Sequence, residues 1–184
     1  MDQLQKERLL KSKNLVDKIK SKLTIINIIL FGLCLLFMVI GGSAINLSTR
    51  YDSMDIGFWK ISELAKEAQE TRSLEQLAST LSTLSVFTIV LVIVLAAGVL
   101  LNLVWRTWDD KKHNTIKNIV AAVFFSVVLI MFFMIISMNN SSSAAVLPGW
   151  AFWIMFVCAL IAGMLHLMVF AVEKQLAKVE INEQ

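Results

Sequence analysis

The chain has 184 residues, of which 57% are hydrophobic and 17% are charged, and its net charge is +3. Soluble domains average roughly 45–50% apolar and about 25% charged residues. A mean hydropathy of +0.71 therefore excludes a disordered chain, a nucleic-acid-binding tail and an ordinary cytosolic enzyme. This composition is typical of a polytopic membrane protein.

Long gaps between charged residues define the predicted spans. Uncharged runs of 27, 30 and 55 residues separate Lys22 from Arg50, Glu75 from Arg106, and Lys117 from Glu173. About 20 apolar residues in a helix cross roughly 30 Å of hydrocarbon, so each of the first two runs holds one span. The third run holds two, because the polar residues 139–143 and the Pro148-Gly149 pair interrupt it.

The pattern therefore predicts an all-α integral membrane protein with four transmembrane helices. The predicted segments are a basic amphipathic N-terminus at 1–22, spans at 23–45, 86–105, 119–138 and 147–172, loops at 46–85, 106–118 and 139–146, and a C-terminus at 173–184. The apolar runs do not alternate in polarity, which excludes a transmembrane β-barrel. A cleaved signal peptide is the alternative for the first span, but its apolar stretch exceeds the usual length of a signal core.

The distribution of basic residues predicts the orientation. Basic and acidic residues number seven and three in 1–22, four and six in 46–85, and four and two in 106–118. Since Lys and Arg mark cytoplasmic segments, both termini are expected in the cytoplasm, with 46–85 and 139–146 outside. Trp105 and Trp108 are then expected to anchor one membrane face, and Trp150 and Trp153 the other.

Lysines surround a ragged apolar stripe in the N-terminal segment. These membrane-surface candidates are Lys11, Lys13, Lys18, Lys20 and Lys22. A basic amphipathic helix can lie on anionic lipid, with each cation contributing about 1 kcal/mol. The alternative is a solvated topology signal that runs straight into the first span.

The loop 46–85 is the only sizeable segment expected outside the membrane. From Phe58 onward it is predicted to form an amphipathic helix that leads into the second span and projects outward. Leucines recur at helical spacing at Leu74, Leu77, Leu81 and Leu84, which places an apolar stripe on one face. This stripe packs either within the monomer or on a partner or a second copy.

Small and polar residues at a spacing of four predict close helix contacts, within one chain or between chains. The candidate helix-packing residues are Gly98, Asn102, Ala122, Ser126, Ala159, Gly163 and His166. His166 is expected to hydrogen-bond across a helix contact, and a haem ligand or proton relay is the alternative. A relay would lack companions, because the predicted spans contain no Asp, Glu, Lys or Arg.

No catalytic, phosphate-binding or dinucleotide motif is present in the sequence, so neither enzymatic activity nor a cofactor or metal is expected. The leading hypothesis is a non-enzymatic accessory, assembly or immunity-type membrane subunit. Its expected partners are the lipid bilayer and either another membrane protein or a second copy of the chain, not nucleic acid. The composition suits a bacterial plasma (inner) membrane.

Two other functions are weighed against this hypothesis. One is a homo-oligomeric pore or channel lined by Asn27, Thr88, Asn102 and Ser126. The other is a small membrane enzyme or haem protein that uses His166.

Overall fold

The computed structural model describes residues 3–48, 53–70, 75–104, 111–139 and 145–181. Its elements, in chain order, are α1 (Gln3–Val39), β1 (Ser43–Ser48), β2 (Ser53–Gly57), the short 3-10 helix η1 (Phe58–Lys60), α2 (Ile61–Glu70), α3 (Glu75–Val104), α4 (Lys111–Asn139), β3 (Ala145–Pro148) and α5 (Trp150–Ile181). The chain is mostly helical, as the sequence predicts.

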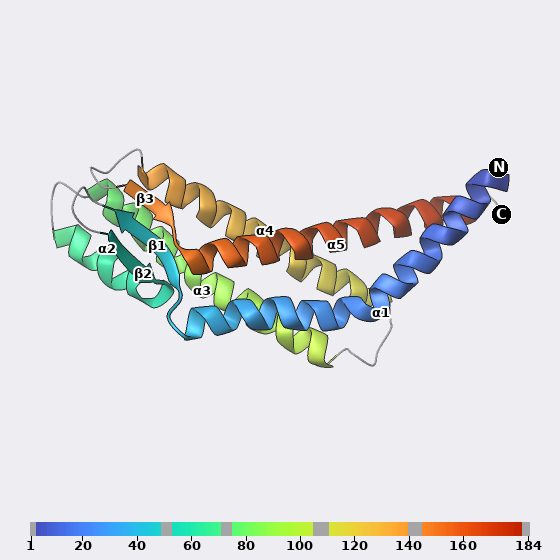
Figure 1. Cartoon of the computed structure of the whole chain (residues 1–184), viewed down its shortest axis with the longest axis horizontal. Helices are drawn as coiled ribbons and strands as arrows, with labels where there is room; N and C mark the ends of the chain where they lie inside the picture. Colours follow the sequence, from blue (N-terminus) through green and yellow to red (C-terminus); the bar gives the residue numbers. More distant parts are fainter. Residues whose placement is uncertain (1–2, 49–52, 71–74, 105–110, 140–144, 182–184) are drawn as a thin grey trace.

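Four long helices form a bundle in which α1 and α4 each pack against both α3 and α5 (Figure 1). Among the described residues, four helical segments are long and apolar enough to cross a membrane: Lys22–Val39, Leu77–Val104, Thr115–Met138 and Trp150–Val172. The prediction of four membrane-length helices is therefore confirmed. Both termini lie at one end of the bundle, and the strands and α2 lie at the other (Figure 1).

The outward faces of these helices are apolar, as their inward faces are. On α3, Leu84, Leu91 and Leu95 are fully buried, whereas Ile89 and Ile93 are more than half exposed. A helix on the surface of a soluble bundle carries polar residues on its outer face. An apolar surface on both sides is what a bundle surrounded by lipid chains presents.

The first span ends earlier than predicted, at Val39 rather than at residue 45. Gly41 adopts a φ of +82°, which a residue without a Cβ tolerates at no steric cost. The amide of Gly42 donates to the Phe37 carbonyl at 2.8 Å, and that of Gly41 donates to the Met38 carbonyl at 3.4 Å. This pair of bonds is a Schellman motif, which satisfies the last helical carbonyls and releases the chain into β1.

A three-stranded antiparallel sheet, in the order β2-β1-β3, covers this end of the bundle. This sheet corrects the sequence prediction, which places residues 43–45 and 147–148 in spans. Central strand β1 pairs with β2 next to it in the chain and with β3 about a hundred residues later, as in the pairs Leu47–Met54 and Leu47–Val146. We refer to residues 43–48, 53–70 and 145–148 as the cap.

The predicted helix from residue 58 into the second span is also corrected. The structure has η1 and α2, which end at Glu70, and a separate helix α3 that begins at Glu75. Instead of projecting outward in line with the second span, α2 packs against α3. It buries Ile61, Ala65 and Ala68, which lie at the three- and four-residue spacing of one helix face.

Helices α1 and α5 bring the two cysteines together. Cys34 and Cys158 are free and buried, and their thiols lie close enough to interact with each other. A membrane-permeable oxidant such as iodine is therefore expected to couple the two thiols into a disulfide within one chain, as iodine takes up the two electrons and two protons are released. Mass-tagged maleimide after denaturation should count two thiols before oxidation, none afterwards, and two again after reduction. Persistent thiols, or disulfide-linked dimers on a gel, would contradict this packing of α1 on α5.

Candidate functional site

A buried polar cluster joins all four long helices near the end of the bundle opposite the cap. Asn27 on α1 is 1% exposed, Asn102 on α3 is 2% exposed, and His166 on α5 is 5% exposed. Asn118 on α4 completes the cluster. Each of these polar groups lies on the face of its helix that packs into the bundle. Burial of such groups is costly unless every one of them is hydrogen-bonded.

The hydrogen bonds of this cluster form one consistent chain. Asn102 donates through Nδ2 to the Gly98 carbonyl at 2.7 Å, and Asn27 Nδ2 donates to Asn102 Oδ1 at 3.5 Å. The second proton of Asn27 Nδ2 is directed at His166 Nε2, at 3.1 Å. With Nε2 as acceptor, the neutral imidazole carries its proton on Nδ1 and donates it to Asn118 Oδ1. One neutral tautomer therefore satisfies both ring nitrogens of His166.

Lys117 is a buried cation on helix α4. The sequence predicts that it belongs to the loop 106–118, whereas it lies inside the candidate span Thr115–Met138 and is 8% exposed. Its Nζ donates to Thr24 Oγ1 on α1 at 3.3 Å. A signal for this position was present in the sequence, because the buried face of α4 has a repeat of four and three residues that extends back to Lys117. That face comprises Lys117, Ala121, Phe124, Val128, Met131, Ile135 and Met138.

The predicted leucine stripe (Leu74, Leu77, Leu81 and Leu84) packs largely within the monomer. Leu81 and Leu84 are buried in the core of the monomer, which corresponds to the first of the two alternatives for the stripe. Leu77 is half-buried and packs against the same core. Leu74 lies outside the described residues.

Three of the predicted helix-packing residues, Gly98, Ala159 and Gly163, lie at contacts inside the bundle. A Cβ atom at Gly98 would lie 2.4 Å from Cδ2 of Phe31, so the missing side chain admits that ring between α1 and α3. Ala159 is fully buried, and Gly163 lies against Phe125 of α4.

Ala122 and Ser126 do not form the close helix contact within the monomer that their spacing allowed. Both are on the exposed side of α4, and Ser126 donates to the Ala122 carbonyl at 2.9 Å. The helical period instead directs Ala121 and Phe124 into the bundle. A contact of this face with a second copy stays a prediction.

The expected membrane anchors are only partly described. Trp150 and Trp153 are about half exposed at the start of α5, where their rings pack against Phe37 and Phe132 respectively. Trp105 and Trp108 lie outside the described residues. In the N-terminal segment, Lys11 and Lys22 are exposed on the continuous helix α1, and the side chains of Lys13, Lys18 and Lys20 are not described.

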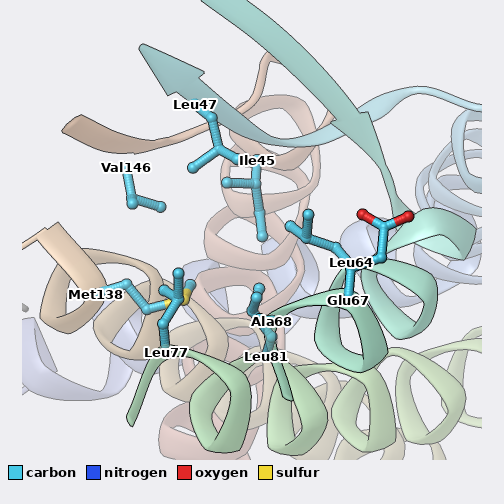
Figure 2. Close-up of a pocket in the computed structure, with 9 residues that line it drawn as sticks. All are labelled: Ile45, Leu47, Leu64, Glu67, Ala68, Leu77, Leu81, Met138 and Val146. Atoms are coloured by element: carbon cyan, nitrogen blue, oxygen red, sulfur yellow. The ribbon is translucent and has the colours of Figure 1, made fainter. Parts of the chain in front are cut away.

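A cavity of about 320 Å³ lies between the cap and the bundle. Figure 2 shows Ile45, Leu47 and Val146 of the sheet on one side of it. The other side is formed by Leu64, Glu67 and Ala68 of α2, Leu77 and Leu81 of α3, and Met138 of α4. The cavity is far from the cluster around His166, because it lies at the opposite end of the bundle. Sequence reasoning missed it, because its walls come from five separate elements.

Compared with known proteins, the chain matches no family model and no curated protein sequence.

Proposed function

We propose that this chain is a non-enzymatic four-helix integral membrane protein that acts through contacts with another membrane protein or with its own copies. Such a protein would serve as an accessory, assembly or immunity-type subunit. The observation that carries the proposal is the cap, a small folded surface with two edge strands at one end of the bundle.

The edges of the sheet are the part of the cap best suited to a contact. Within the described residues, β2 and β3 each pair with β1 in the sheet, so they are its two edge strands. Unpaired edge strands are templates for pairing with another chain. Both edges also expose large apolar side chains, with Met54 on β2 being 58% exposed and Leu147 on β3 being 49% exposed.

The cluster around His166 supports a structural role for these polar residues. The two ring nitrogens of His166 form hydrogen bonds with Asn27 and Asn118. Hydrogen bonds of this kind hold membrane helices together. Of the residues considered for a pore, Asn27, Asn102 and Thr88 are buried inside the monomer, and only Ser126 is exposed. The arrangement therefore favours a packed bundle over a pore lined by these side chains.

Site-specific photocrosslinking in native membranes tests the proposed contact. A photoreactive phenylalanine analogue at Met54 or Leu147 is expected to give a protein adduct of defined mass, identified by mass spectrometry. The matched control is the same analogue at Lys66, which is exposed on helix α2 and not on a strand. With the analogue at position 147, Ala145→Lys on the same edge strand should abolish the adduct while membrane insertion persists. If neither edge position gives a protein adduct, or Lys66 gives the same one, the proposed contact is wrong.

A further inference from the structure

The cavity beneath the cap has the size and lining of a small-ligand site. Eight of its nine lining residues are apolar, and seven of the eight are aliphatic Ile, Leu, Val or Ala. An apolar cavity of about 150 Å³ is already large enough to stay dry and hold benzene. At about 320 Å³, this one falls at the lower end of the range for ligand pockets. Its walls offer an occupant dispersion contacts and almost no hydrogen bonds, which selects hydrocarbon.

The position of the cavity relative to the spans indicates where that hydrocarbon comes from. Leu77 is the first residue of one candidate span, and Met138 is the last residue of another. Both line the cavity, so its floor lies at the level where the apolar helices end. Lipid chains of the adjoining leaflet reach the same level. A bilayer lipid is thus the nearest and most abundant source of hydrocarbon.

The one charged lining residue constrains the head group. Glu67 is exposed, and in Figure 2 its carboxylate lies beside Leu64 at the edge of the cavity. The same helix carries exposed Glu63 and Glu70, against the single cation Lys66. This negative edge repels anionic heads and attracts an ammonium group.

We propose that the cavity beneath the cap binds one hydrocarbon chain of an amine-headed bilayer lipid, whose ammonium group lies near Glu67. The chain contacts Leu47 and Val146 of the sheet on one side, and Leu77 and Leu81 of α3 on the other. Bound lipid would join the sheet to the helices and would complete the apolar core between them. The proposal does not depend on the contacts suggested for the edges of the sheet.

Photolabelling of the protein in lipid nanodiscs tests this site. The probe is a phosphatidylethanolamine with a diazirine in the middle of one acyl chain, diluted in phosphatidylcholine. Peptide mapping is expected to place adducts on 45–47, 64–68 and 77–81. Adducts confined to the outward faces, such as Ile89 or Phe133, would show ordinary annular lipid and would overturn the proposal.

Two pairs of matched variants sharpen the test. Leu77→Trp places a larger side chain in the cavity and is expected to lower cap labelling about ten-fold, whereas Ser79→Trp, on the exposed face of the same helix, should not. Glu67→Lys is expected to shift preference towards a phosphatidylglycerol probe by about two- to five-fold, the range of an exposed ion pair. Glu63→Lys makes the same charge change outside the lining and should shift it less.

Each of these comparisons can overturn part of the proposal. Unchanged labelling in a folded Leu77→Trp protein, verified by its elution and thermal transition, would show that the chain does not enter the cavity. Equal labelling of the native protein by phosphatidylethanolamine and phosphatidylglycerol probes would remove the role of Glu67.

Discussion

Replacing Gly98 with alanine is expected to destabilise the bundle by about 1–3 kcal/mol, the usual cost of overpacking a close contact. The added methyl carbon would lie 2.4 and 2.6 Å from two ring carbons of Phe31. That ring cannot move away freely, because its centroid packs 5.3 Å from that of Phe124 in an edge-to-face contact. Relief therefore requires α1 and α3 to separate. Reversible unfolding in mixed micelles, followed by circular dichroism, measures the effect.

Gly32 provides the matched control for this substitution. It also lies within a span, on α1, but a Cβ atom there would meet nothing within 4 Å. Gly32→Ala should be neutral or stabilising by up to about 1 kcal/mol, since alanine favours the helix. Shortening the opposing side chain with Phe31→Leu should recover part of the Gly98→Ala loss. Equal stabilities of Gly98→Ala and Gly32→Ala would show that α1 and α3 are not in the described contact.

Sequence reasoning found the parts of the fold that depend on local composition. The four helices were predictable, because uncharged apolar runs of this length have few alternatives in a membrane protein. Their ends were less predictable. Gly41 and Gly42 carried a helix-stop signal, but the apolar run continued through Ala44 and Ile45 into β1. Hydropathy alone could not distinguish a buried strand from the last turn of a span.

The sheet could not be predicted from neighbouring residues. Strand β3 has only four residues, and its partner β1 lies about a hundred positions earlier in the chain. Such pairing is visible only when α1 and α5 are known to be neighbours. The cavity has the same origin, because its walls meet only after the helices and the sheet are assembled.

The polar cluster was partly predictable, less so than the helices and more so than the sheet. His166 was singled out as a residue that could bond across a helix contact, and Asn27 and Asn102 were noted as polar residues of the spans. The bonds that join the three depend on the rotation and depth of separate helices, which one sequence does not fix. The sequence predicts a loop position for Lys117, because this residue ends the charged stretch that precedes the uncharged run 118–172. Its burial depends on Thr24 of a neighbouring helix.

Replacing His166 with leucine is expected to destabilise the bundle by about 2 kcal/mol. The substitution leaves the part-buried Asn118 Oδ1 and one proton of the buried Asn27 without their His166 partner. A buried polar group that loses its partner costs about 1–3 kcal/mol. Single hydrogen bonds between membrane helices average only about 0.6 kcal/mol, which limits the total.

A double-mutant cycle separates the network from the size and shape of the side chains. Asn27→Leu removes the other end of the same bond, so the double variant should lose less stability than the sum of the two single variants, by at least about 0.5 kcal/mol. Thr88→Val is the control, because Thr88 is equally buried but bonds within its own helix, to the Leu84 carbonyl at 3.0 Å. It should cost less than His166→Leu. Strictly additive losses, or a His166→Leu protein as stable as Thr88→Val, would show that the cluster does not hold the four helices together.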